Sequence, residues 1–244
     1  MTYSLKKCSD YFIDKWYKKL QDWDIGYCPV TTYKLIKFSQ QDIRYFLKKK
    51  QFSEHLKKEL ETLFPGEYFF KLSHRSPKDI LEKKIKINNS DHRTTKLEKK
   101  RKQLAILKVV SVENILELLL KSKRTREDLK LCLRETVDIH LVFQPWRPST
   151  GTEYRCFINR RKLVGICLYK PEYYSSRTVI PVGLIQEFIS KLFERIDYEK
   201  FVVDIFENDS RIYFIEINPF EEFLDTFSFE WDIISNSNTL LVTI

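Results

Sequence analysis

Apolar and polar residues alternate along two neighbouring segments near the end of the chain, within residues 201–220. The segments read FVVDIF and RIYFIEINPF, and a polar turn separates them. Alternation with a period of two predicts a pair of strands joined as a hairpin. Asp204, Glu216 and Asn218 interrupt these otherwise apolar runs, and a buried charge requires a partner or a metal ion. The pattern therefore predicts a magnesium site on the hairpin, since Mg²⁺ prefers oxygen ligands.

The length of the turn decides whether the three side chains share a face. Glu216 and Asn218 are two residues apart, so they point to the same side of a strand. We expect Asp204 to join them only if the turn contains an odd number of residues, as a turn of Asn208, Asp209 and Ser210 would. A two-residue turn would place Asp204 on the opposite face. A polar edge strand with one face in water explains the same spacing, which does not choose between the two interpretations.

Periodic segments elsewhere predict a mixture of helices and strands. In chain order they are a helix at 9–23, a strand at 31–38, helices up to the Pro65–Gly66 break, a strand at 104–110, a helix capped by Ser111, a strand at 139–146, a hairpin at 153–169 and a helix opened by Pro181. In the 153–169 hairpin, Arg155 lies between apolar neighbours and shares a face with Phe157, and the expected turn is residues 159–161.

Two strand ends carry groups that suit a nucleotide. The strand in EYFFKLSHRSPKDI delivers Lys71 into a turn that contains Ser73 and Ser76. Hydroxyls and backbone N–H groups beside a lysine can cradle phosphate, although a solvated lysine at a strand end fits the spacing equally well. The strand IHLVFQPW ends at Gln144 and Trp146, which could offer backbone groups and an indole to adenine. An ordinary strand end with a packed tryptophan is the alternative.

Composition narrows the class of protein. The 244 residues are 43% hydrophobic and carry a net charge of +9, which favours anionic partners such as nucleotides, RNA or acidic surfaces. Five separated cysteines without a CxxC pair indicate reduced thiols and a cytoplasmic protein. Only five glycines occur, all far apart, which excludes the GxGxxG and GxxxxGK[ST] motifs. We expect neither a secretory signal at the start nor a membrane-spanning segment.

A basic run occupies residues 83–102. It contains nine Lys or Arg residues against two acidic ones, which is most of the excess positive charge of the chain. Such a run is usually a solvated loop or an exposed helix face, and it could equally be an arm that contacts RNA. No aromatic residue interrupts it, so we expect any such contact to be with phosphate.

Several segments, in order, resemble the cell division cycle protein 123 family of the ATP-grasp superfamily. The matching segments are WYKKL with TTYKLIKF, FFKLSHRSPKDI, LKVVSVENILELLLKSKR, EYRCFINRRKLVGICLY and FVVDIF with IYFIEINPFEEFLDTFSFEW. The chain departs from the family pattern in reading Ser73-His74 where the family has Asn-Trp, and Gln-Pro-Trp where it has Arg-Lys-Trp. It also lacks the acidic segment between the lobes and the tail that follows Glu-Trp-Asp in longer members.

The resemblance implies an ATP-grasp fold with two α+β lobes and the nucleotide between antiparallel sheets. We expect an N-terminal lobe at 1–103, with the basic run as an insertion, and an ATP-grasp lobe at 104–244. Carried over by residue, the implied contacts with ATP are Lys71, Ser73, Ser76, Lys108, Gln144, Trp146 and Arg155, with Lys71 and Arg155 on the phosphates. The implied Mg²⁺ ligands are Asp204, Glu216 and Asn218.

The resemblance also implies a biological role. Eukaryotic members assemble the heterotrimeric translation initiation factor two by binding its γ subunit, so we expect an ATP·Mg²⁺-binding assembly factor that is a monomer. The alternative, from the wider superfamily, is an ATP-dependent ligase that acts on RNA ends or on a carboxylate. A nucleophilic lysine for that chemistry could be Lys71, Lys108 or Lys121, and the sequence does not choose among them.

Overall fold

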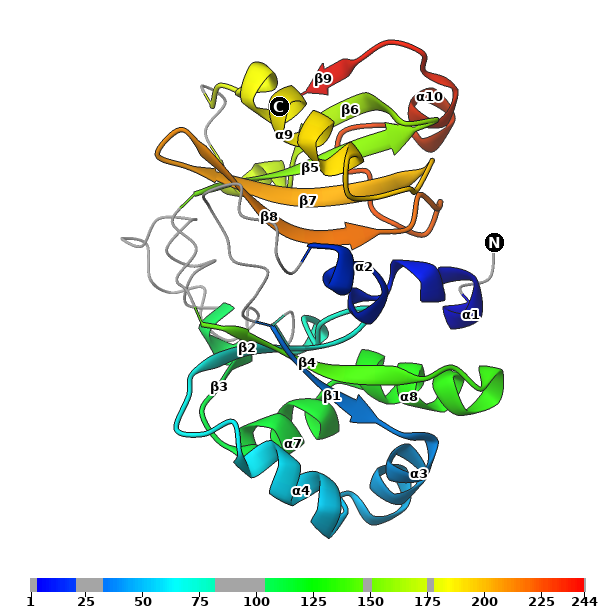
Figure 1. Ribbon diagram of the computed structural model, residues 1–244, viewed down its shortest axis with the longest axis vertical. Helices are drawn as coiled ribbons and strands as arrows, with labels where there is room; N and C mark the ends of the chain where they lie inside the picture. Colours follow the sequence, from blue (N-terminus) through cyan, green and yellow to red (C-terminus); the bar gives the residue numbers. More distant parts are fainter. Residues whose placement is uncertain (1–3, 21–32, 82–103, 147–150, 175–177, 244) are drawn as a thin grey trace. The chain divides into compact units, whose positions relative to one another are not determined.

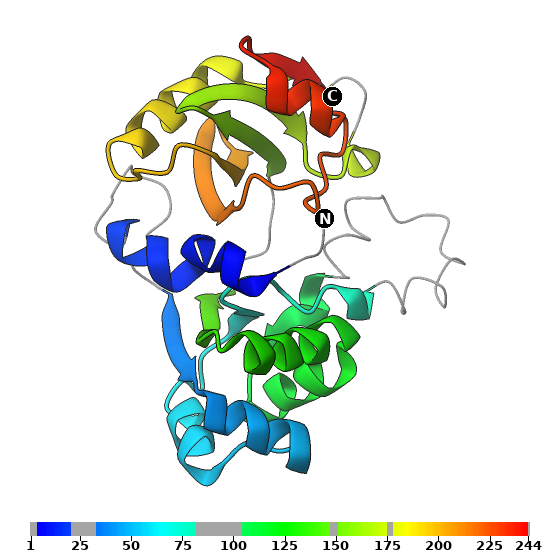
Figure 2. The same ribbon diagram turned by 90° about the vertical axis from the view of Figure 1, so that its right-hand side faces the viewer.

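Two compact units make up the computed structural model (Figures 1 and 2), in which residues 4–20, 33–81, 104–146, 151–174 and 178–243 are described. The N-terminal unit consists of Ser4–Ser9 and Thr32–Pro148, and the C-terminal unit consists of Met1–Tyr3, Asp10–Thr31 and Ser149–Ile244. This division differs from the boundary after residue 103 that we expected from the sequence. The reason is hydrogen bonding, because the strand at Tyr68–Leu72 pairs with strands on both sides that follow residue 103.

The N-terminal unit is built on an antiparallel sheet, which has four strands in the described part of the chain. The strands are β1 (Lys34–Phe38), β2 (Tyr68–Leu72), β3 (Lys108–Val109) and β4 (Ile139–Pro145), in the spatial order β1-β4-β2-β3. The helices of this unit are α1 (Leu5–Cys8), α3 (Gln40–Lys49), α4 (Glu54–Glu61), α7 (Val112–Lys121) and α8 (Lys123–Glu135). The four longer helices gather on one side of the sheet (Figure 1). Phe38, Phe46 and Phe143 are fully buried in the core.

Serine side chains set the first residue of these helices. The hydroxyl groups of Ser39, Ser53, Ser111 and Ser122 each accept a hydrogen bond from the backbone N–H three residues later. Such a cap satisfies one of the N–H groups that the first turn of a helix leaves without an intrahelical partner. The cap predicted at Ser111 is therefore present.

The C-terminal unit is built on a second sheet, with five strands among the described residues. The strands are β5 (Thr152–Asn159), β6 (Lys162–Leu168), β7 (Phe201–Asn208), β8 (Arg211–Asn218) and β9 (Leu241–Thr243), in the order β8-β7-β5-β6-β9. Only β9 runs parallel to its neighbour, and the other pairs in the described sheet are antiparallel. The helices of this unit are α2 (Ile13–Leu20), α9 (Val182–Phe193) and α10 (Trp231–Asn236). Helix α9 follows Pro181, as predicted, and buries Ile185, Phe188, Ile189 and Leu192.

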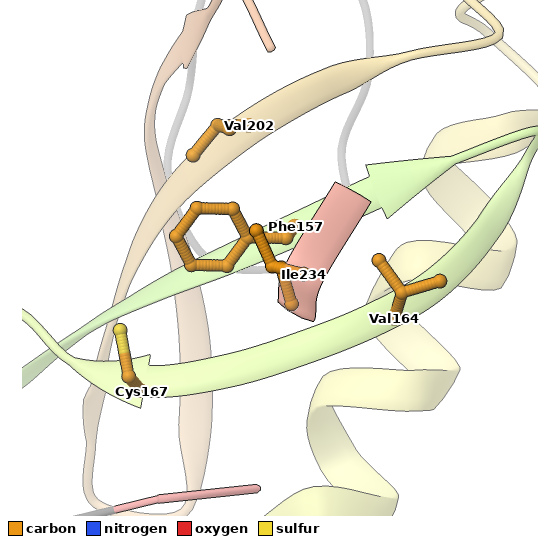
Figure 3. Packing of buried hydrophobic residues seen from close by; sticks show 5 residues of the cluster. All are labelled: Phe157, Val164, Cys167, Val202 and Ile234. Atoms are coloured by element: carbon orange, nitrogen blue, oxygen red, sulfur yellow. The ribbon is translucent and has the colours of Figure 1, made fainter. Parts of the chain in front are cut away.

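An apolar cluster joins the C-terminal segment to this sheet. Phe157, Val164, Cys167 and Val202 surround Ile234 of α10 (Figure 3). A Cβ atom at Gly165 would come within 2.4 Å of the Ile234 Cδ1 atom, so this glycine makes room for α10. The cluster therefore fixes the segment that follows β8 against strands β5, β6 and β7.

Other sequence expectations differ in detail from the structure. The helix expected at 9–23 begins only at Ile13, after a 3₁₀ turn at Ser9–Tyr11. The strand expected at 104–110 is reduced to Lys108–Val109, because a 3₁₀ turn at Ala105–Leu107 precedes it. The β5–β6 turn contains two residues, Arg160 and Arg161, rather than three, since Asn159 already pairs with Lys162. Both turn residues have positive φ, as a tight hairpin turn of this length requires. In the described ranges, no helix is long and apolar enough to span a membrane.

Candidate functional site

The β7–β8 hairpin brings Asp204 and Glu216 directly opposite each other. The turn contains two residues, Asp209 and Ser210, so the odd-numbered turn that we set as the condition for Asp204 to join this face is absent. Both have positive φ, at 52° and 59°, as in the turns that favour tight hairpins. The register shifts between Asp204 and Ile205, so that Ile205 pairs with Phe214 while Asp204 pairs with Glu216. This β-bulge supplies the extra residue that we had assigned to the turn, and Asp204 therefore shares a face with Glu216.

The same face continues across the sheet to Arg155. Strand β5 places Arg155 opposite Asp204, which makes a row of Arg155, Asp204 and Glu216 across three strands. Arg155 donates from Nε to Asp204 Oδ1 and from Nη2 to Asp204 Oδ2, both at 2.8 Å. Asn218 donates from Nδ2 to Asp204 Oδ2 at 3.1 Å. Asp204 is therefore held in one orientation by a bidentate ion pair and by a neighbouring amide.

Burial makes this ion pair energetically significant. Arg155 and Asp204 are 4% and 2% exposed, whereas Glu216 and Asn218 are half-buried. Burial of Arg155 opposes its charge, but the attraction of Asp204 outweighs burial, so the pKa of Arg155 is raised further above its ordinary value. A pair this deep stays charged only because each member compensates the other.

Aromatic rings complete the surroundings of Arg155. The guanidinium carbon lies 4.9 Å from the ring centre of Tyr169 and 5.0 Å from that of Phe227. Arg155 Nη1 also donates to the backbone carbonyl of Asp225 at 2.5 Å. Phe227 has a φ of 56°, which is unusual for a bulky residue. The segment after β8 thus packs over Arg155 and restricts where its guanidinium can point.

The oxygen atoms on this face of the hairpin show whether it fits a magnesium ion. Two carboxylates and an amide, from Asp204, Glu216 and Asn218, are oxygen donors of the kind that Mg²⁺ takes. Mg²⁺ usually uses one or two carboxylates and completes its shell with water and phosphate. Among the described residues, no group of three or more His, Cys, Asp or Glu that could hold a metal ion is found. The side chains therefore fit a magnesium ion that arrives with a phosphate ligand.

In the N-terminal unit, three of the predicted ATP contacts lie on one face of the sheet. Phe69 of β2 pairs with Lys108 of β3 and with Gln144 of β4, so these residues point the same way. Lys71 is two residues beyond Phe69 on β2, and so it shares this face. Lys71 is buried, and Lys108 forms an ion pair with Glu67 at 2.6 Å. The sheet thus gathers an amide and two ammonium groups on the face opposite its buried aromatic residues.

The remaining predicted residues flank this face. The backbone N–H of Trp146 donates to the carbonyl of Glu67 at 2.9 Å, which ties the end of β4 to the start of β2. Ser73 and Ser76 are buried in the loop after β2. Ser73 exchanges two hydrogen bonds with the backbone of His140, at 3.0 and 3.3 Å. The basic run 83–102 lies outside the described residues.

Sequence reasoning did not identify the residues around Arg155. Tyr169 could have been found from the pattern, because it lies two residues after Cys167, which pairs with Arg155 on the same face. Asp225 and Phe227 gave no signal, because their segment has no regular periodicity and contributes through a backbone carbonyl and an irregular φ.

Comparison with known proteins gives a consistent set of similarities. A family model described as D123 matches residues 50–240. The protein named "Translation initiation factor eIF2 assembly protein" from Danio rerio is 30% identical over 112 residues, which cover 43% of this chain and 32% of that protein. The protein of the same name from Candida albicans is 27% identical over 184 residues, which cover 68% of this chain and 48% of that protein. The matches thus span about a third to a half of these relatives.

Solved structures match along nearly the whole chain. The C-terminally truncated Cdc123 from Schizosaccharomyces pombe has a TM-score of 0.69 and 21% identity, and the match covers 99% of this chain and 98% of that one. A second structure of Cdc123 from the same organism has a TM-score of 0.64 and 19% identity, with the same coverage. At such identities the likeness is one of fold. It confirms the expected α+β fold with antiparallel sheets, which this chain shares with Cdc123.

Proposed function

The chain belongs to the D123 family, whose model matches residues 50–240, and we propose that it is an ATP- and magnesium-binding factor for the assembly of the translation initiation factor eIF2. The relatives that carry the name of an eIF2 assembly protein support the second half of this proposal. A cytoplasmic location belongs to the same proposal, because translation initiation takes place there. We also propose that the protein acts as a monomer.

The row of Arg155, Asp204 and Glu216 carries the ATP·Mg²⁺ proposal. A buried carboxylate that is locked by an arginine presents its oxygens in a fixed direction, which favours a cation that demands regular geometry. Glu216 and Asn218 lie half-buried on the same face and add further oxygens. When bound, Mg²⁺ would neutralise and orient the phosphates of ATP. Asp204, Glu216 and Asn218 would hold the ion, and Arg155 would fix Asp204 and lie close to the phosphate end.

The N-terminal unit supplies groups of a different kind. Lys71 and Lys108 share a face and bring positive charge, which suits phosphate. Ser73 and Ser76 in the following loop would add hydroxyl or backbone donors. Gln144 and Trp146 at the end of β4 would bind the adenine base, through polar groups and through stacking of the indole ring. Isothermal titration with ATP in the presence of Mg²⁺ tests this assignment, since Lys71→Ala is expected to weaken binding while the exposed Lys49→Ala is not.

The partner within eIF2 is proposed to be its γ subunit, as the family resemblance suggests. Affinity capture by immobilised γ subunit, with and without ATP and Mg²⁺, is the direct test. Capture that requires the nucleotide supports the proposal. Failure to bind γ while ATP still binds would leave a nucleotide-binding protein with another partner.

Contact of the basic run 83–102 with RNA is a separate proposal, and steep loss of RNA binding with added salt would support it.

Ligase chemistry remains the alternative use of a bound nucleotide. It would require transfer of a phosphoryl or adenylyl group to an acceptor, and Lys71, Lys108 and Lys121 are the lysines considered for a covalent step. Incubation with labelled ATP and Mg²⁺ separates the two functions, because an assembly factor of the proposed kind binds ATP without forming a labelled covalent intermediate. A stable label on one of these lysines would favour the ligase.

A further inference from the structure

A buried carboxylate on α8 holds the loop that follows Lys71. Asp128 is 1% exposed. It accepts one hydrogen bond from Arg75 Nε at 2.6 Å and a second from Arg75 Nη2. His74 Nε2 lies 3.1 Å from Asp128 Oδ2. His74 and Arg75 are consecutive residues between Ser73 and Ser76. One side chain of a helix therefore binds the middle of the loop that contains the predicted phosphate contacts.

The far end of the loop is attached to the same helix with donor and acceptor exchanged. Here the carboxylate belongs to the loop, at Asp79, and the donors belong to the start of α8. Ser122 Oγ donates to Asp79 Oδ1 at 2.5 Å, and the backbone N–H of Arg124 donates to Asp79 Oδ2 at 3.1 Å. Ser122 is itself fully buried. Since Asp128 binds the middle of this segment and Asp79 attaches its end to the start of α8, the loop has little freedom to move relative to α8.

The charges at Asp128 indicate a role in conformation rather than in stability alone. Burial raises the pKa of Asp128, but its combined interactions with His74 and Arg75 outweigh burial, so its pKa lies below the ordinary value. Buried ion pairs add little net stability compared with apolar packing of the same shape, because desolvation offsets the attraction. They do select one geometry, since each donor must meet its acceptor. Apolar side chains could join the loop to α8 without fixing the direction of its backbone.

We propose that Asp128 is a positioning residue for nucleotide binding, which acts through His74 and Arg75 to fix the loop from Ser73 to Asp79 beside Lys71. The proposal rests on the proposed function, because it takes this loop as a contact for the phosphates of ATP. Asp128 itself need not touch the nucleotide. Its effect is to present Ser76 and the loop backbone in one arrangement before ATP arrives.

The test combines ATP affinity with a property of the free protein. Isothermal titration measures the Kd for ATP in the presence of Mg²⁺, and amide hydrogen exchange without nucleotide measures the opening of residues 71–79. Asp128→Asn is expected to weaken ATP binding by about tenfold or more, as for other residues that orient a binding group from behind. It is also expected to accelerate exchange in the loop.

Asp42→Asn is the matched control. Like Asp128, Asp42 is a carboxylate that accepts two side-chain hydrogen bonds, here from Ser39 at 2.5 Å and Ser53 at 2.6 Å, but it joins α3 to α4 instead of holding the loop. We expect this variant to lose stability towards urea with an unchanged Kd for ATP. Equal weakening of ATP binding by Asp42→Asn and Asp128→Asn would overturn the proposal, because it would reduce the effect to general destabilisation.

A second pair of variants covers the case in which Asp128→Asn does not fold. His74→Gln keeps an N–H donor for Asp128, whereas His74→Leu removes it at similar size. We expect His74→Gln to bind ATP close to the wild-type affinity and His74→Leu to bind several-fold more weakly. Equal affinities for the two variants would refute the positioning role. A wild-type protein that binds no ATP would instead refute the proposed function, and this inference with it.

Discussion

The guanidinium of Arg155 and the carboxylate of Asp204 form a bidentate ion pair with two hydrogen bonds of 2.8 Å, buried in the middle of the C-terminal sheet. The pair lies directly across neighbouring strands. Tyr169 and Phe227 enclose its cationic end, and Asn218 touches its anionic end. The orientation of Asp204 is thus fixed by the folded chain itself, before any ligand binds.

Breaking this pair from one side is expected to be costly. Arg155→Met leaves Asp204 buried without its cation, and we predict a loss of about 3 kcal/mol or more in the free energy of unfolding. Urea denaturation measures this loss. The double variant Arg155→Met, Asp204→Leu removes both charges, and we expect it to recover much of the stability, since apolar side chains tolerate this environment. A double variant that is less stable than Arg155→Met would contradict the account.

In the β7–β8 turn, we expect a substitution that increases the free energy of unfolding. Asp209 and Ser210 both have positive φ, and Ser210→Gly creates the Asp-Gly pair that two-residue hairpin turns prefer. We expect it to stabilise the protein by about 0.5–1 kcal/mol, because glycine adopts this conformation without steric strain. Ser190→Gly is the control, since Ser190 lies exposed within α9 and a glycine there should destabilise. Loss of stability in Ser210→Gly would show that the turn differs from this description.

Much of this hairpin could be predicted from its sequence, but its register could not. Alternating residues predicted both strands and the common face of Glu216 and Asn218. The bulge opposite Asp204 has no comparable signal, since Ile215 is an ordinary strand residue and no glycine marks the site. A one-residue shift reverses every side chain of a strand. For this reason the turn length alone did not predict that Asp204 shares a face with Glu216, because the bulge compensates for the two-residue turn.

Tertiary contacts explain the other differences. The apolar run LAILKVV suggested a long strand, but a short apolar run is also compatible with a buried turn, and only Lys108–Val109 pairs with β2. Helix α10 and strand β9 were not predicted because their short segments lack periodicity. They are stabilised by contacts such as those of Ile234 with Phe157 and Val164, which sequence spacing does not reveal.

The buried His74 predicts how stability depends on pH. Burial lowers its pKa below the ordinary 6.5, and this effect outweighs the opposing attraction of Asp128. Arg75 and Lys71 lower it further. The unfolded state therefore binds a proton at a higher pH than the folded state, so stability is full above about pH 6.5 and falls as the pH decreases through the folded pKa.

Urea denaturation between pH 7.5 and about pH 5 measures this dependence. We expect the free energy of unfolding to fall over this range in the wild-type protein, and to fall less in His74→Gln, which cannot titrate there. His55→Gln is the control, because His55 is exposed and lies on the surface of α4. An equal pH dependence in wild type and His74→Gln would show that His74 does not titrate as its environment requires.

The magnesium dependence of ATP stabilisation in Asp204→Asn tests the central claim most directly. Each variant is compared with its own ligand-free melting temperature, so any loss of intrinsic stability cancels. ATP at about 100 times its Kd should stabilise the wild-type protein by about 2.7 kcal/mol when Mg²⁺ is present. Most of this gain should disappear in Asp204→Asn and persist in the turn variant Asp209→Asn. A full magnesium-dependent shift in Asp204→Asn would contradict the assignment of Asp204 as the centre of an ATP·Mg²⁺ site.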